Sequence, residues 1–276
     1  MKEQKKAQQF LQKRMIHFSI LLPVRNGWPL IRECVDSILK QTYPHFKLHI
    51  LDNNSNDNTI EWLESLDDER IEVTKSGKDL SIVDSWSRIT TIKKNEFMTL
   101  IGHDDILYPN FLLTVNRLIK NNKDAGLYFT GGHFINSKGA ILRSLKEPDR
   151  TETTAEYLER RFSFKSDVSG TGYVMRSEDF DKVGGMPKFE SLFFSDDALW
   201  MLLIEGRYKA SDPKEHYAVR LHIGSESATN PSIWRKLVVS LEQFDNFLVE
   251  YIKRDRQAKI IYEKNAESFF LENFRK

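Results

Sequence analysis

Two pairs of adjacent aspartates are the groups in this sequence best suited to chemistry. One pair is Asp104 and Asp105, and the other is Asp196 and Asp197. Adjacent carboxylates repel each other, so they persist at low cost only where water surrounds them or a cation pairs with them. Mg²⁺ and Mn²⁺ favour oxygen ligands and take one or two protein carboxylates together with substrate phosphates. The alternative for the first pair is that one aspartate caps a helix beginning near Pro109.

The second pair stands at the start of a helix-like segment that continues through residues 199–204. A carboxylate in such a place can act as a general base toward a hydroxyl group of a substrate. Acidic residues are also favoured in a first helical turn, because the helix dipole stabilises negative charge there. The local sequence leaves both interpretations open.

The stretch DNNSNDNT, residues 52–59, contains a third candidate group. Asp52 ends an apolar run and is followed by amide and hydroxyl groups that can hydrogen-bond a nucleotide base or a ribose. A turn followed by a helix cap at Asp57 or Asn58 explains the later polar residues well. It explains less well why a carboxylate ends the apolar run.

Arg220 and His222 form a fourth candidate group near the end of an extended segment. Residues two apart on such a segment point the same way, so together they could hold a diphosphate or complete a metal shell. A lone histidine is more often structural. Cys34 lies on the apolar face of a predicted helix, where a thiol is most often inert core.

The elements that position these groups alternate between strands and helices in the first half of the chain. Apolar runs predict strands at 17–24, 46–51, 71–74 and 97–101. Helical spacing predicts helices at 28–41, 59–66 and 80–92. Such alternation indicates crossover units and a mostly parallel sheet. Ligands of open α/β sheets bind at the carboxyl ends of the strands, and the polar clusters 23–27, 52–58 and 103–105 each follow a strand.

The second half of the chain is less regular. Residues 127–134 and 140–145 are strand-like, and 146–153 form a polar loop. Glycines at 170–172 and 184–185 are expected to let the backbone approach a ligand closely. Beyond Pro231, apolar residues recur at helical spacing, which predicts a long amphipathic helix that packs on the body or on a partner such as a second copy of the chain.

Composition excludes several classes of protein. The 276 residues include 41 basic and 40 acidic side chains, a net charge of +1, whereas a dedicated nucleic-acid binder carries a basic excess. The single cysteine excludes a disulfide framework and a multi-cysteine zinc site. No apolar run is long enough to span a membrane, and the N-terminus lacks the apolar core of a secretory signal. These features predict a soluble, cytoplasmic protein.

The charges are unevenly distributed along the chain. Residues 1–15 hold five basic and one acidic side chain, residues 16–231 hold 27 and 32, and residues 232–276 hold nine and seven. We hypothesise that the basic ends draw the protein to anionic lipid at the inner membrane face or to a lipid-pyrophosphate acceptor.

Taken together, these clusters resemble an inverting family-2 glycosyltransferase of the GT-A fold, in the nucleotide-diphospho-sugar transferase superfamily. SILLPVRNG resembles the family's opening strand and donor-binding turn, and DNNSNDNT its second-strand motif. SIVDSWSR and EFMTLIGHDDILYPNFL resemble the stretch leading into its metal motif. GTGYVMRSEDFDKVGGMP and SDDALWMLLIEGRY resemble its acceptor-side and catalytic-base segments. The likeness covers residues 17–228 in the same linear order, which is more specific than any single motif.

On the donor side, the resemblance implies that Pro23, Val24 and Asn26 line the nucleotide, largely through backbone groups. It implies that Asp52 binds uracil or ribose.

The resemblance also implies a divalent cofactor, Mn²⁺ or Mg²⁺. Asp104 and Asp105 would supply the DXD-type function, one toward the ribose and one on the metal, and His222 would contact the diphosphate or the metal. His103 stands where many relatives carry another acidic residue, so the aspartate that ligates the metal stays open.

On the acceptor side, Asp196 matches the family's catalytic base, because Leu199 and Trp200 follow it by three and four residues. Asp197 is the alternative base. Ser195 stands where the family often carries glutamate.

The resemblance implies a metal-dependent, inverting transferase of the α/β GT-A fold, with a mostly parallel central sheet flanked by helices. It would move a sugar from a nucleoside-diphosphate sugar, UDP-sugars being favoured, to a hydroxyl of a glycan or lipid-linked acceptor in surface polysaccharide or glycoconjugate synthesis. One alternative is a sugar-phosphate nucleotidyltransferase, although the turn after the first strand has only Arg25 in place of a basic, glycine-rich loop. The other is a non-catalytic nucleotide- or sugar-binding module whose carboxylates only cap helices.

We therefore expect four segments. A basic N-terminal segment occupies 1–16, a donor-binding half 17–125, an acceptor-binding and catalytic-base half 126–230, and a C-terminal amphipathic helical extension 231–276.

Overall fold

The computed structural model of the chain describes residues 15–146, 150–221 and 231–275. One mixed sheet runs through the molecule in the order β3-β2-β1-β4-β9-β6-β10-β5. The N-terminal half of the chain supplies its first four strands, all parallel to one another: β1 (Phe18–Val24), β2 (Phe46–Asp52), β3 (Ile71–Lys75) and β4 (Phe97–Leu100). Their carboxyl ends therefore meet along one edge of the sheet.

Short helices connect these strands. They are α2 (Leu30–Leu39), α3 (Thr59–Glu64) and α4 (Ile82–Ser87), the last continued by a 3₁₀ turn, η1 (Arg88–Thr91). Helix α2 buries Ile31, Cys34, Val35 and Ile38 against the sheet, which confirms the predicted apolar stripe and the core position of the cysteine. The predicted helices at 28–41 and 80–92 are longer than α2 and α4, because propensity and spacing do not mark helix ends sharply.

The rest of the chain, after β4, adds both parallel and antiparallel strands to the sheet. Its strands are β5 (Ile106–Leu107), β6 (Leu127–Ile135), β7 (Ile141–Ser144), β8 (Thr151–Glu152), β9 (Tyr173–Arg176) and β10 (Lys209–Arg220). Its helices are α5 (Phe111–Asn121), α6 (Thr154–Phe162), α7 (Ser177–Lys182), the 3₁₀ turn η2 (Glu190–Leu192) and α8 (Ser195–Ile204). Strand β9 pairs antiparallel with both β4 and β6 and so joins the two halves.

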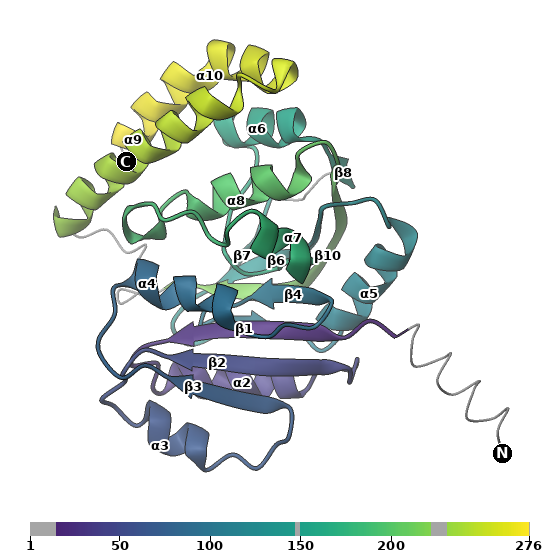
Figure 1. The fold of residues 1–276 in the computed structure, drawn as a ribbon, viewed down its shortest axis with the longest axis vertical. Coiled ribbons are helices and arrows are strands. Elements are labelled where there is room, and N and C mark those ends of the chain that lie inside the picture. The colour runs from purple at the N-terminus through teal and green to yellow at the C-terminus, as the bar shows by residue number, and fades with distance from the viewer. Residues whose placement is uncertain (1–14, 147–149, 222–230, 276) are drawn as a thin grey trace, which may run out of the picture.

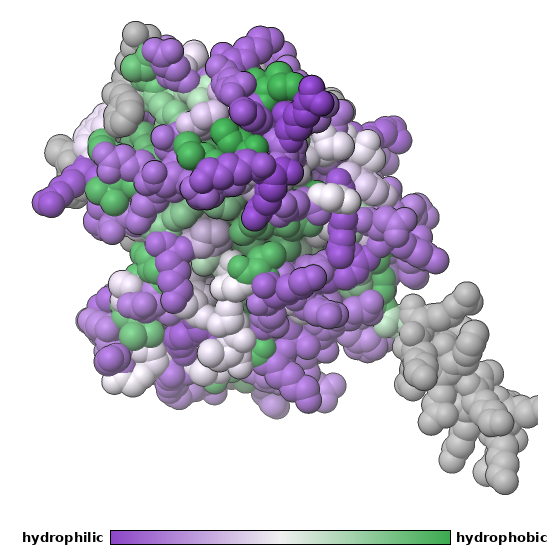
Figure 2. Space-filling view, turned by 45° about the horizontal axis from the view of Figure 1, so that its top comes forward, coloured by the Kyte–Doolittle hydropathy of each residue, from purple (hydrophilic) through white to green (hydrophobic). Residues whose placement is uncertain are grey.

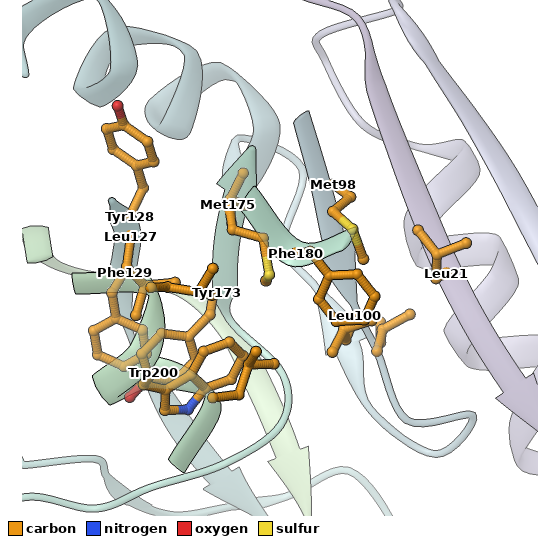
Figure 3. Packing of buried hydrophobic residues seen from close by; sticks show 14 of the residues in the cluster. Leu21, Met98, Leu100, Leu127, Tyr128, Phe129, Tyr173, Met175, Phe180 and Trp200 are labelled. Carbon is orange, nitrogen blue, oxygen red and sulfur yellow. The ribbon is translucent and has the colours of Figure 1, made fainter. Parts of the chain in front are cut away.

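A stack of aromatic side chains fills the core beneath the second half. Trp200 of α8 stacks on Tyr173 of β9 with ring centroids 4.3 Å apart, and Tyr173 stacks on Phe129 of β6 at 4.2 Å (Figure 3). All three side chains are buried. Stacked rings of this kind contribute beyond the area that they bury, and here they fix α8 against the sheet.

Two long helices close the chain, α9 (Pro231–Tyr251) and α10 (Arg256–Arg275). They lie side by side over α6 and α8 (Figure 1). The predicted apolar stripe is buried: Phe244 stacks on Phe194 at 5.3 Å, and Phe269 stacks on Phe162 at 4.6 Å. These helices therefore pack on the body of the molecule. In the described part of the chain, no helix is long and apolar enough to cross a membrane.

Candidate functional site

A cleft of about 800 Å³ lies along the carboxyl ends of β1 and β4 and reaches across to α8. Its donor-half wall includes Pro23, Val24, Arg25, Asn53 and Trp86, and its other wall includes Met186, Leu192, Phe193, Asp196 and Leu237. A second pocket, of about 580 Å³ around Arg176 and Arg207, lies away from the predicted groups. The space-filling view shows hydrophobic side chains exposed between the hydrophilic upper and lower parts of the molecule (Figure 2).

Hydrogen bonds join the loops that follow β1 and β2. The Asn26 backbone N–H donates to Ser55 Oγ, and Asn26 Oδ1 accepts from the backbone N–H of Asn56, both at 2.9 Å. The Trp28 N–H donates to Asp57 Oδ2 at 3.1 Å. Pro23 and Val24 line the cleft as expected, whereas the side chain of Asn26 holds the neighbouring loop and is not among the residues that line the cleft. Asn26 has φ of 52°, a conformation in which asparagine is one of the few favoured residues.

Asp52 is buried at the end of β2 with one oxygen unused. Its Oδ2 accepts from the Ser55 N–H at 3.2 Å, and Oδ1 has no hydrogen-bond partner among the described residues. An unpaired buried acceptor is costly and usually signals an absent ligand or water. Its neighbour Asn53 lines the cleft. The Asn53 side-chain amide donates through Nδ2 to the Leu80 carbonyl and accepts through Oδ1 from the Leu80 N–H, which fixes the loop after β3.

The carboxylates of Asp104 and Asp105 converge at the end of β4. A Cβ atom added to Gly102 would lie 2.9 Å from Asp104 Oδ1 and 3.1 Å from Asp105 Oδ2. Only glycine leaves room for both carboxylates at this position. The capping alternative is wrong, because Asn110 is the N-cap residue of α5 and β5 intervenes.

Asp105 is held by two hydrogen bonds from distant parts of the chain. Thr171 Oγ1 donates to its Oδ2 at 2.5 Å, and the backbone N–H of Arg220 donates to its Oδ1 at 3.0 Å. Burial and the neighbouring charge of Asp104 raise the pKa of Asp105 to about 7, although both hydrogen bonds act in the opposite direction. A cation in the cleft would relieve this cost.

Arg220 does not have the role expected from its spacing. Its buried guanidinium donates to the Asp104 carbonyl at 2.8 Å, to the carbonyls of Asn136 and Ser137, and to Glu33 Oε2 at 2.6 Å. All three guanidinium nitrogens are therefore engaged, and they tie the Asp104 loop to α2 and to the turn after β6. His222, which was expected to hold a diphosphate or complete a metal shell together with Arg220, lies outside the described residues.

The two carboxylates suit a divalent cation but do not make a complete protein site. Within the described ranges no three His, Cys, Asp or Glu side chains are grouped so as to hold a metal ion. Two converging carboxylates, one of them with a raised pKa, nevertheless match the ligand set of Mg²⁺ or Mn²⁺ when substrate phosphates complete the shell.

Asp196 and Asp197 open α8 but have different surroundings. Asp197 is buried, and its Oδ1 accepts from Arg161 Nε and from Tyr157 Oη, both at 2.8 Å. Asp196 is partly exposed in the cleft, and its Oδ1 accepts from the Asp197 N–H at 2.9 Å. Burial and the charge of Asp197 raise the pKa of Asp196 to about 7, against an opposing effect of Arg161.

The loop before this pair has a strained backbone. Ser191, Leu192 and Phe194 have φ of 51°, 62° and 61°, a region that costs a bulky residue about 1–3 kcal/mol. Helix α9 supports the loop, because Gln243 Oε1 accepts from the Glu190 N–H at 2.6 Å. The C-terminal extension thus helps to position the start of α8.

Arg161 and Thr171 are candidate functional residues that the sequence did not single out. Thr171 lies within the glycine-rich segment already noted, but nothing in the sequence marks its hydroxyl or Arg161 as a partner of an aspartate, and each meets its aspartate only in the folded chain. Gly170 lines the cleft, as expected of the first glycine-rich segment. Gly184 and Gly185 follow α7 and are not among the residues that line the cleft, although the next residue, Met186, is.

The fold is an α/β sheet with carboxylates at the carboxyl ends of its strands, and these line the cleft. The chain belongs to glycosyltransferase family 2: residues 19–184 match the model described as "Glycosyl transferase family 2". An uncharacterised glycosyltransferase of Rickettsia typhi is 26% identical over 92% of this chain and 77% of its own length. Two other curated glycosyltransferases match over only 36% and 22% of their own lengths.

Solved structures agree on the fold. TarS of S. aureus in complex with UDP-GlcNAc superposes with a TM-score of 0.69 at 16% identity, over 90% of this chain and 71% of TarS. The mannosyltransferase PcManGT of Pyrobaculum calidifontis, in complex with GDP-Man and Mn²⁺, gives a TM-score of 0.62 at 14% identity, over 93% and 70%.

Proposed function

We propose that this protein is a metal-dependent, inverting glycosyltransferase that moves a sugar from a UDP-sugar to a hydroxyl of a glycan or lipid-linked acceptor, in surface polysaccharide or glycoconjugate synthesis. The observation that carries the proposal is that one cleft is lined by Asp104 and Asp105 from the donor half and by Asp196 from the other half. The leaving diphosphate needs positive charge near it, and the attacking hydroxyl needs a group that accepts its proton. The cleft has residues suited to each role.

The donor half offers a hydrogen-bond acceptor for a nucleotide base that carries a ring N–H. Asp52 Oδ1, buried and without a partner in the described part of the chain, would accept such a hydrogen bond. Uracil offers one, and a UDP-sugar is bound by the fold neighbour TarS. Pro23 and Val24 would then lie along the nucleotide. Because guanine also offers donors, GDP-sugars belong in the test.

Asp104 and Asp105 would hold a divalent cation, Mn²⁺ or Mg²⁺. Such an ion neutralises the charge that develops on a leaving diphosphate. Gly102 keeps the two carboxylates close together, and Thr171 fixes the orientation of the Asp105 carboxyl group. His222 remains a candidate third ligand from outside the described residues.

Asp196 would be the general base. It takes the proton of the acceptor hydroxyl as that oxygen forms a bond to the anomeric carbon, and the bond from this carbon to the diphosphate breaks on the opposite face with its electron pair. This in-line displacement inverts the configuration. A carboxylate with a pKa of about 7 suits this role, because a base works best when its pKa lies near the operating pH.

Incubation with UDP-, GDP- and dTDP-sugars in the presence of Mn²⁺ tests the proposal. We expect release of the nucleoside diphosphate and no release when EDTA replaces the metal. A parallel reaction offers a nucleoside triphosphate and a sugar 1-phosphate, and release of pyrophosphate there would instead identify a nucleotidyltransferase. Binding without turnover of any donor, with acceptor glycans present, would favour a binding module and contradict the proposal.

A further inference from the structure

The two aspartates at the start of α8 differ in what they contact. Arg161 is buried on α6, and its Nε lies 2.8 Å from Asp197 Oδ1. Tyr157, one helical turn earlier, donates to the same oxygen. Oδ1 of Asp197 is therefore engaged by two side chains of α6, whereas the described contact of Asp196 is the backbone N–H of its neighbour.

Aromatic rings enclose the guanidinium of Arg161. Its Cζ lies 5.8 Å from the Phe194 ring centroid and 5.2 Å from that of Phe269 on α10. Burial alone would lower the pKa of Arg161, but the ion pair with Asp197 raises it, so the side chain stays cationic. Arg161 lines the cleft together with both aspartates, and its ion pair fixes it beside Asp197.

We propose that Arg161 is a positioning residue whose ion pair engages Asp197 Oδ1 and leaves Asp196, the more exposed of the two carboxylates, as the proton acceptor. This inference rests on the proposed function. It assigns distinct tasks to two carboxylates that are equivalent in the sequence. Asp197 acts through its charge, which increases the basicity of Asp196, and Arg161 moderates that effect.

In the part of the chain that the structure describes, the charged and titratable groups close to Asp196 are Asp197 on its own helix, Arg161 and Tyr157 on α6, and Tyr173 on β9. The same cleft is also lined by other charged or titratable groups: Arg25, His103, Asp104, Asp105 and Arg220. The contacts of α9 and α10 in this region are the apolar residues Leu237, Phe244 and Phe269. A shift in the titration of Asp196 can therefore be traced to a small set of substitutions.

The test is a carboxyl-carbon NMR titration of the metal-free protein labelled with ¹³C-aspartate. It needs neither donor nor acceptor, and spectra of Asp196→Asn and Asp105→Asn assign the two signals that titrate near pH 7. We expect Asp197→Asn to lower the midpoint of Asp196 by about one unit or more, since it removes a neighbouring like charge. Arg161→Met should move the first protonation of the aspartate pair to higher pH.

A second variant covers the case in which Arg161→Met does not fold because it leaves a buried carboxylate unpaired. The double variant Arg161→Met/Asp197→Leu removes both charges together and should lower the midpoint of Asp196. Arg160→Met is the matched control. Arg160 precedes Arg161 on α6, and its Nε lies 3.0 Å from Oε1 of buried Glu152. Neither residue is among those that line the cleft. Arg160→Met should leave the midpoint unchanged.

The inference is overturned if Asp196 titrates at the same pH in wild type, Asp197→Asn and the double variant, or if Asp197 is the residue that titrates near pH 7. These results would leave the proposed function standing, since that depends on loss of transfer in Asp196→Asn. Conversely, full transfer by Asp196→Asn would overturn the base assignment, whatever the titrations show.

Discussion

The hydroxyl of Thr171 donates a hydrogen bond to Oδ2 of Asp105 over 2.5 Å, although the two residues lie 66 positions apart in the chain. This bond connects the segment before β9 to the loop after β4. It joins the glycine-rich acceptor-side segment to the carboxylate that we propose for the metal. Several predictions about the site depend on this link and on the close packing around it.

Thr171→Val removes the hydroxyl with little change of shape. Because the hydrogen bond from Thr171 lowers the pKa of Asp105, its loss should raise that pKa and make Mn²⁺ compete with a proton at pH 7. We expect Mn²⁺ affinity to fall by about 10-fold to 100-fold, measured by calorimetry with the nucleotide present. Thr130→Val is the control, since Thr130 is buried with no hydrogen-bond partner for its hydroxyl among the described residues. Equal Mn²⁺ affinity in wild type and Thr171→Val would contradict the role of this bond.

Gly102→Ala should separate the two carboxylates of the metal motif. Its Cβ would come within about 3 Å of both, so at least one must move. A displacement of about 1 Å at a reacting site costs on the order of 100-fold in kcat/KM. Gly77→Ala is the control because a Cβ there meets nothing within 4 Å. Unchanged kinetics of Gly102→Ala would mean that the convergence of the carboxylates is unimportant.

Asp105→Asn should stabilise the metal-free protein at pH 8. A carboxyl whose folded-state pKa is raised binds its proton more tightly when folded, so the free energy of unfolding decreases as pH rises from its ordinary value of 3.8 to about 7. Asparagine avoids this loss. We expect a higher Tm than wild type without metal and no further increase on adding Mn²⁺. A lower Tm would show that burial of the carboxylate is not a cost.

The pH dependence of transfer should report Asp196. Its ionised form is the active one and its pKa is about 7, so activity should decrease below that pH by about tenfold per unit. The profile is measured as kcat/KM for the acceptor at saturating Mn²⁺ and donor, which keeps Asp105 ionised. An acid limb near pH 4, the ordinary value for an aspartate, would indicate a base in a different environment.

The carboxyl-end cluster of the donor half was predictable from sequence. Val24, Asp52 and Leu100 each end a short apolar run, and parallel strands bring such ends together without any knowledge of packing. The start of α8 at the second aspartate pair was also predictable from local sequence, because acidic residues are favoured in a first helical turn and an apolar helical run follows them.

The partners of these groups were not predictable. Arg161 precedes Asp197 by 36 positions, and nothing in the local pattern of α6 marks one arginine of two adjacent ones as the partner. Arg220 was expected to face a diphosphate, yet Glu33 and three carbonyls bind its guanidinium. Such choices depend on tertiary packing, because only the folded chain decides which long side chain reaches a buried acceptor.

The assignment of Asp196 as the general base is tested most directly by comparing wild type with Asp196→Asn in a transfer assay that contains Mn²⁺ and the preferred donor. Binding of the corresponding nucleoside diphosphate to both proteins is measured by calorimetry. Loss of a general base should reduce transfer by about 10²–10⁴-fold. Nucleotide affinity should stay close to that of wild type, because Pro23, Val24 and Asp52, the groups proposed to bind the nucleotide, lie at the ends of β1 and β2 and not on α8. Undiminished transfer in Asp196→Asn would contradict the account.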